Sequence, residues 1–372
     1  KYYLGTAWYR RDIAIPKSWQ GKYIELTLER CHWKSTVYVD GNPVGSQDSL
    51  GTPHRYDLST LAPGQHTLTI GVDNRYLAPV GRDASSITDH TQTNWNGIVG
   101  DISLKATDPV WIADLQAYPD IHAKRVRVVA KLGNSTEKPF RGTLKLTAES
   151  FNADIVHRPP SVEISIDANV VEAVLPVGDE MQLWDEFRPA LYRLQAVLSG
   201  DGIGDLRTTT FGMREIKAVD RTIQVNDVPR FMRGTLDCAS FPKTGYPAMD
   251  LAEWRRIFKN CKAYGLNHMR FHSWCPPEAA FAAADLEGVY LQVECGVWSG
   301  TGDEPFLLAE TPRIVGEYGN HPSFALLSHG NEPGNHAWLR DTWVPFAKKL
   351  DSRHLVTAGS HHPLTANSDY LV

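Results

Sequence analysis

Hydrophobic and polar residues alternate in short segments along the first part of the chain, and turn residues separate the segments. The alternating segments are Ala7–Ile15, Tyr23–Leu28, Thr36–Val39, Thr67–Val72 and Ile102–Leu104. Such alternation is typical of β-strands that bury one face, and Asp40-Gly41 between two of the segments is a strong hairpin signal. We therefore predict that residues 1–106 form an all-β domain, a sandwich of the jelly-roll type.

The alternation continues after a junction marked by Asp108-Pro109 and Pro119. The next segments are Arg125–Lys131, Gly142–Ala148, Ser161–Ile166 and Tyr192–Leu198. Their number and length are typical of an immunoglobulin-like sandwich. We assign residues 107–215 to this second β domain.

The hydrophobic period changes after Ile216, because strands now alternate with amphipathic helices. The predicted strands are Phe231–Gly234, His268–Phe271, Val289–Glu294, Ser323–Ser328 and Leu355–Ala358. Four helices are predicted. One begins after the N-cap residue Asp250, and the others lie at Glu278–Leu286, near Ala309–Tyr318 and near Ala337–Leu350. Residues 216–372 thus supply five strands, whereas a (β/α)8 TIM barrel has eight. The predicted fold class is multidomain β plus α/β, with an incomplete barrel whose open edge favours self-association into a homo-oligomer.

Composition and charge exclude several classes of function. The net charge is −5 with acidic and basic residues mixed along the chain, so no basic stripe for a nucleic acid is present. No apolar run reaches the length of a membrane span, about 18 residues. The five cysteines have no metal-like spacing, and no metal or cofactor is predicted. The first residues, from Lys1, have the pattern expected of a strand and not of a signal peptide, and we expect a periplasmic or secreted bacterial location.

Polar residues mark the ends of the predicted parallel strands, where barrel enzymes hold their working side chains. Glu332 follows the fourth strand, and a carboxylic acid there can protonate a glycosidic oxygen. The neighbouring Asn331 can hydrogen-bond the sugar 2-hydroxyl. Arg233, Arg270, His272 and Trp298 also lie at or near these predicted strand ends and are the further candidate site residues. The alternatives are a capped loop with an exposed glutamate, scaffold roles for the arginines and histidine, and rim packing for the tryptophan.

Motifs in all three segments resemble those of family 2 glycoside hydrolases, which include β-galactosidases, β-glucuronidases and β-mannosidases. The first segment carries Ala7-Trp8-Tyr9-Arg10-Arg11, Val39-Asp40-Gly41 and Asn94-Trp95-Asn96-Gly97-Ile98-Val99-Gly100, and the second carries Leu183-Trp184, Pro189-Ala190-Leu191-Tyr192 and Phe211-Gly212-Met213-Arg214. The third carries Phe231-Met232-Arg233-Gly234, Asn267-His268-Met269-Arg270, Tyr318-Gly319-Asn320-His321-Pro322-Ser323 and His329-Gly330-Asn331-Glu332.

The resemblance implies a retaining β-glycosidase that hydrolyses O-glycosidic bonds of a β-glycoside in oligo- or polysaccharides. It gives Glu332 as the general acid/base, Asn331 as the partner of the 2-hydroxyl, and Arg233, Arg270 and His272 as groups that shape the site. The family nucleophile is a second glutamate on a later strand, so we expect this chain alone to be inactive. The stretch Trp298–Asp303 is short for the family's active-site loop. A catalytically inactive carbohydrate-binding protein of the same architecture is the alternative, and a purely structural array of sandwiches is disfavoured.

Overall fold

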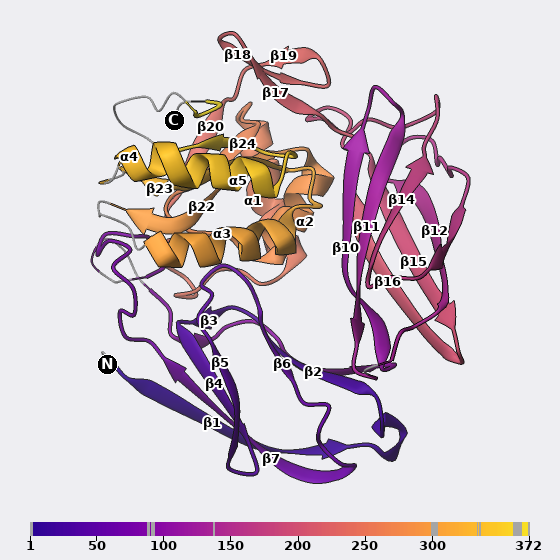
Figure 1. Cartoon of the computed structure of the whole chain (residues 1–372). Coiled ribbons are helices and arrows are strands. Elements are labelled where there is room, and N and C mark those ends of the chain that lie inside the picture. Colours follow the sequence, from indigo (N-terminus) through magenta and orange to yellow (C-terminus); the bar gives the residue numbers. More distant parts are fainter. Residues whose placement is uncertain are drawn as a thin grey trace.

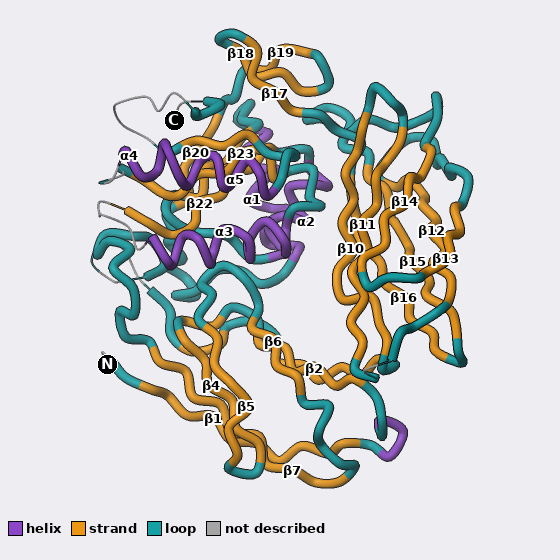
Figure 2. The backbone as a smooth tube through the Cα atoms, viewed as in Figure 1, coloured by secondary structure: helices purple, strands orange, loops and turns teal. Residues whose placement is uncertain are grey.

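The chain consists mainly of β-sheets, with its α-helices gathered in one part of the molecule (Figure 2). The computed structural model describes residues 3–87, 90, 94–136, 138–298, 304–332, 334, 336–359 and 367–370. Two antiparallel β parts lie beside a helix-covered parallel sheet, one below it and one to its right in Figure 1. No helix in the described ranges has the length and apolar character needed to cross a membrane.

The first β part has two main sheets, with strand orders β1-β7-β4-β5 and β6-β2-β9. Its elements are β1 (Thr6–Ile15), η1 (Lys17–Trp19), β2 (Tyr23–Leu28), β3 (Cys31–His32), β4 (Lys34–Val39), β5 (Asn42–Gln47), β6 (His54–Asp57), β7 (Gly64–Asp73), β8 (Gly97–Ile98) and β9 (Ile102–Thr107). Alternate residues of β2 and β4 point into one core shared by the two sheets. The alternation of the sequence therefore reports the burial of one face of each strand.

The second β part is also a pair of antiparallel sheets around a shared core, with orders β10-β11-β14 and β13-β12-β15-β16. Its strands are β10 (Val110–Asp120), β11 (Arg125–Asn134), β12 (Gly142–Phe151), β13 (Val162–Ile166), β14 (Val170–Pro176), β15 (Leu191–Gly200) and β16 (Ile203–Phe211). A small antiparallel sheet follows, built from β17 (Ile216–Val219), β18 (Thr222–Val225) and β19 (Val228–Arg230).

The last part is a five-stranded parallel sheet in sequential order, β20-β21-β22-β23-β24. Its elements are β20 (Gly234–Asp237), α1 (Leu251–Ala263), β21 (His268–Phe271), α2 (Glu278–Glu287), β22 (Tyr290–Trp298), α3 (Glu304–Tyr318), β23 (Phe324–Asn331), α4 (His336–Trp338), the π-helical segment η2 (Leu339–Trp343), α5 (Val344–Leu350) and β24 (Leu355–Thr357). Every residue of β23 is buried, as expected of a parallel strand covered on both faces. The predicted alternation of strands and helices is confirmed here.

The first strand of this sheet was predicted wrongly. It was expected at Phe231–Gly234, but the strand begins at Gly234 and its residues 234–237 pair with 268–271 of β21. Phe231 lies outside the strand and is 76% exposed. An apolar residue next to a strand can lie in the connection before it, and only the pairing with β21 fixes the register.

Helix α1 starts where its sequence cap predicts. The carboxylate of Asp250 accepts a hydrogen bond from the backbone N–H of Glu253 at 2.8 Å, as an N-cap should. Trp254 and Phe258 are fully buried, whereas Leu251 in the first turn is 40% exposed. Helix α3 begins at Glu304, which is earlier than predicted.

Buried polar contacts fasten helix α3 to the first β part, which lies directly beneath it in Figure 1. The carboxylate of Glu310, fully buried on α3, accepts hydrogen bonds from Ser49 Oγ at 2.9 Å and from the backbone N–H groups of Leu50 at 2.9 Å and Gly51 at 2.7 Å. Burial raises the pKa of the Glu310 carboxyl. The hydroxyl of Tyr318 donates to the Gly51 carbonyl oxygen at 2.9 Å. These contacts hold the first β part in a fixed position against the parallel sheet.

The buried His54 in the first β part predicts an acid-sensitive fold. Its Nε2 donates to the carbonyl oxygen of Ser49 at 2.8 Å, and because burial keeps the ring neutral, its Nδ1 accepts from Ser35 Oγ at 2.6 Å. Burial lowers the pKa of His54 from 6.5 to about 4. Between these two values the unfolded chain binds the proton more readily than the folded chain. The stability due to His54 is therefore lost as the pH falls from 6.5 toward 4.

We expect the free energy of unfolding of wild type, measured in urea, to fall more between pH 7 and 4.5 than that of His54→Gln. The loss should be about 2 kcal/mol larger in wild type, because each unit of difference between the folded and unfolded pKa of His54 corresponds to about 1.4 kcal/mol. A glutamine can keep one donor and one acceptor at this position but does not titrate. Equal losses in the two proteins would show that His54 does not carry this acid sensitivity.

Candidate functional site

Five of the six predicted site residues lie at or near the carboxyl edge of the parallel sheet. Arg270 lies on β21 and His272 just follows it, Trp298 ends β22, Asn331 ends β23, and Glu332 comes next. The carboxyl ends of parallel strands meet at one edge, so residues distant in sequence gather there. The described contacts join these residues into two connected groups.

Arg270 is the centre of the first group. Its Nε donates to Glu294 Oε1 at 2.6 Å, and its Nη2 donates to Asn331 Oδ1 at 2.7 Å. The carboxylate of Glu294 is fully buried and also accepts from Gln292 Nε2 at 3.0 Å and from the backbone N–H of Ser273 at 2.6 Å. A buried charge persists only when it is paired and hydrogen-bonded, and this one is both.

The contact with Arg270 also fixes the amide of Asn331. A guanidinium can only donate, so the amide oxygen must face Arg270. The NH2 group of Asn331 is then the part of the amide that faces away from Arg270. This orientation is suited to a sugar hydroxyl that accepts a hydrogen bond.

Trp298 connects the second group. Its Nε1 donates to Glu332 Oε2 at 2.8 Å. The ring of His272 meets that of Trp298 edge to face, with centroids 4.4 Å apart. Burial lowers the pKa of His272, so the imidazole is held toward its neutral form. Glu332 is exposed and has a φ of 42°, an uncommon backbone conformation that places its carboxylate at the edge of the sheet.

Arg233 lies at the opposite end of the sheet. It immediately precedes β20, whereas Glu332 immediately follows β23, and the strands run parallel. Its Nε donates to the carbonyl oxygen of Gly265 at 2.7 Å, and its Nη2 contacts Glu186 Oε2 at 3.3 Å. The structure does not bring Arg233 together with the other candidates, because the first strand begins three residues later than predicted. We therefore leave Arg233 out of the site.

Two acidic residues at this edge were not selected from the sequence. Glu294 lies in the middle of a buried strand, where a lone charged residue among apolar neighbours could have signalled a partner. Asp237 ends β20, and burial raises the pKa of its carboxyl to about 6. Its backbone oxygen accepts hydrogen bonds from the His272 N–H at 2.9 Å and from Trp274 Nε1 at 3.1 Å. Misplacement of the first strand hid Asp237 from the prediction.

A segment of the first β part, residues 78–87, reaches the same edge. The backbone N–H of Trp298 donates to the carbonyl oxygen of Val80 at 2.9 Å, and the backbone N–H of Ser85 donates to Ser273 Oγ at 2.7 Å. These contacts could not be predicted from the sequence, because they join residues about two hundred positions apart. His361 and His362, which follow the fifth strand, and residues 299–303 of the short loop lie outside the described residues.

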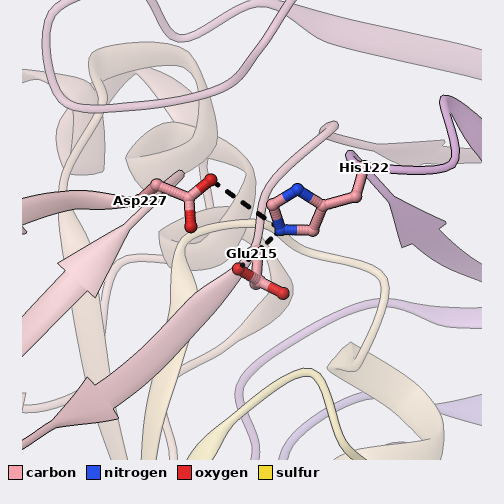
Figure 3. A group of neighbouring side chains, drawn as sticks. All are labelled: His122, Glu215 and Asp227. Carbon is pink, nitrogen blue, oxygen red and sulfur yellow. Dashed lines mark hydrogen bonds and ion pairs between the residues drawn. The ribbon is translucent and has the colours of Figure 1, made fainter.

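A separate group of possible metal ligands lies away from this edge, where the second β part meets the small sheet (Figure 3). His122 Nε2 lies 3.3 Å from Glu215 Oε2 and 3.8 Å from Asp227 Oδ2. Lys217 Nζ contacts the same two carboxylates, at 3.1 Å and 2.5 Å. An ammonium group already contacts both carboxylates and offsets part of their charge, so we interpret the group as a surface ion-pair cluster.

Comparison with known proteins follows the same division of the chain. Residues 110–214, which form the second β part, match the family model described as Glycosyl hydrolases family 2. The resemblance to family 2 glycoside hydrolases is confirmed. Among curated relatives, the chain is 26% identical to Beta-galactosidase 2 of Enterobacter cloacae over 91% of this chain, and 24% identical to a putative beta-glucuronidase of Formosa agariphila over 96% of it.

Solved structures share the fold of this chain. A beta-glucuronidase of Bacteroides uniformis matches 97% of this chain with a TM-score of 0.78 and 22% identity. A putative beta-galactosidase from Bacteroides fragilis matches 100% with a TM-score of 0.83 and 18% identity. The chain spans only about a third of the two curated relatives, 35% and 34%, and 47% and 58% of the two solved chains.

Proposed function

We propose that this chain is part of a retaining β-glycosidase in which Glu332 is the general acid/base. The observation that carries the proposal is the pair at the end of β23, where Glu332 follows an asparagine whose amide is oriented by Arg270. In this assignment Glu332 protonates the leaving oxygen and later removes a proton from water. Asn331 donates to the sugar 2-hydroxyl, and His272 and Trp298 form part of the wall. The curated relatives, β-galactosidases and β-glucuronidases by name, support a β-glycoside substrate.

We further propose how the parts are organised. Residues 1–106 are a jelly roll, residues 107–215 an immunoglobulin-like sandwich, and residues 216–372 the first five strands of a (β/α)8 barrel. The sequential order of the parallel strands supports the barrel, since each strand is added beside the previous one. A retaining enzyme needs a second carboxylate about 5–5.5 Å from the acid/base. We place this nucleophile on a later strand, and we expect residues 1–372 alone to self-associate and to lack turnover.

The full-length protein that contains this chain tests the proposal with a panel of aryl β-galactosides, β-glucuronides and β-mannosides. We expect release of the phenol from at least one class, and the first-formed sugar, followed by NMR, should keep the β configuration. An α product would mean inversion and would rule out the retaining mechanism. Saturable sugar binding without any turnover would instead support the alternative of an inactive carbohydrate-binding protein.

A further inference from the structure

The structure suggests how the exposed carboxylate of Glu332 is held in place. The indole N–H of Trp298 donates to Glu332 Oε2 at 2.8 Å, and the ring itself rests edge to face on His272. An exposed glutamate otherwise samples several rotamers, and ordering it costs side-chain entropy. A donor fixed at the end of β22 lowers that cost, because its own ring is already packed.

Trp298 is held in turn by the first β part. The backbone N–H of Trp298 donates to the Val80 carbonyl oxygen at 2.9 Å. Gly81 follows with a φ of +98°, and a Cβ at that position would lie 1.5 Å from the Trp298 carbonyl oxygen. The backbone N–H of Gly81 also donates to the hydroxyl of Tyr76 at 2.8 Å. Only glycine allows this close approach of the two backbones.

The apolar side chains of this segment belong to the core of the parallel sheet. Ala78, Val80, Ala84 and Ile87 are buried in the same hydrophobic cluster as β21 and β22, and not in the core of the first β part. The segment therefore packs as an element of the parallel-sheet part, although it belongs to the first β part in the sequence. Its position depends on the parallel sheet as much as on its own sandwich.

We propose that Trp298 is a positioning residue for Glu332, and that the segment 78–84 of the first β part sets the place of Trp298 through the Val80–Gly81 backbone. This inference rests on the proposed role of Glu332. The indole N–H stabilises the ionised carboxylate of Glu332, so removal of this hydrogen bond should favour the protonated form. The ionisable groups on the surrounding elements are Arg270 and His272 at β21, Glu294 on β22, His329 on β23, and Arg82 and Asp83 on the segment.

The variant Trp298→Phe in the full-length protein tests the inference. It removes the N–H and keeps an aromatic ring. Glycosylation needs protonated Glu332, so the loss of the bond should move the alkaline limb of kcat/KM upward by about 0.5–1 pH unit. We also expect kcat to fall about three- to tenfold with little change in KM. A purely structural role for Trp298 would leave the alkaline limb in place.

Two glycine variants form a matched pair. Gly81→Ala should lower kcat and shift the same limb, because the new Cβ must displace the Trp298 backbone. Gly21→Ala introduces a side chain at a similar φ, +75°, but no heavy atom lies within 4 Å of that Cβ. It should reduce the melting temperature without any shift of the pH profile. If both variants behave alike, the contact with Trp298 has no role in catalysis.

Failure of this inference can be told apart from failure of the proposed function. If Glu332→Gln keeps wild-type activity, Glu332 is not the acid and the proposed function fails first. If Glu332→Gln removes the activity while Trp298→Phe leaves the alkaline limb unchanged, the acid/base assignment stands and the positioning role of Trp298 is overturned.

Discussion

Replacing Glu332 with alanine in the full-length protein should lower kcat on poorly activated β-glycosides by about 10²–10⁴-fold, the usual contribution of general acid/base catalysis. A leaving alkoxide is a strong base and cannot depart without a proton. Aryl glycosides with acidic phenols need little protonation, so their glycosylation step should be nearly unchanged while deglycosylation becomes slow. Steady-state and pre-steady-state rates on the two substrate classes measure this difference.

Added azide supplies the control for this variant. The small anion can attack the glycosyl-enzyme without a general base, so turnover of the activated substrate should recover and yield the β-glycosyl azide with net retention. Rates on unactivated glycosides that stay within a few-fold of wild type would contradict the role of Glu332. An α-glycosyl azide would contradict the retaining mechanism.

The variant Arg270→Met should destabilise the protein by about 3–5 kcal/mol, the usual cost when one partner of a buried ion pair is removed. The side chain of Glu294 is fully buried and that of Arg270 is only 14% exposed, so the remaining carboxylate would be left without its counter-charge. Asn331 would also lose the donor that orients its amide. Urea unfolding of the full-length protein measures the loss of stability.

The double variant Arg270→Met/Glu294→Gln should recover much of this stability, because no uncompensated charge stays buried. Arg340→Ala provides the surface comparison. Its partner Asp341 is 56% exposed, and an exposed pair contributes about 0–1 kcal/mol. A loss for Arg270→Met no larger than that for Arg340→Ala would mean that the Arg270–Glu294 pair does not support the folded state.

The sequence by itself predicted that the first two parts of the chain are built from β-strands and that the last part alternates strands with helices. Alternation gave five strands of the first β part and four of the second, because each of these strands buries one face and exposes the other, and the segment Tyr23–Leu28 matches β2 residue for residue. Other strands, such as β5, β10 and β14, were not predicted. The capping pattern at Asp250 located the start of α1, since an N-cap acts over only three residues. The position of Glu332 after the fourth parallel strand could also be predicted, because a buried strand and the residue that follows it are recognised from neighbouring residues in the sequence.

Only the tertiary structure decided which residues meet. Arg233 was expected beside Glu332 but lies at the other end of the sheet, because strand pairing, and not the local apolar run, sets where β20 begins. The contacts of Arg270 with Glu294 and Asn331, and of Val80 with Trp298, join separate segments of the chain. Periodicity reports whether a residue is buried, but it carries no information on which distant residue buries it. For that reason the strands could be predicted from the sequence, whereas the surroundings of Glu332 could not.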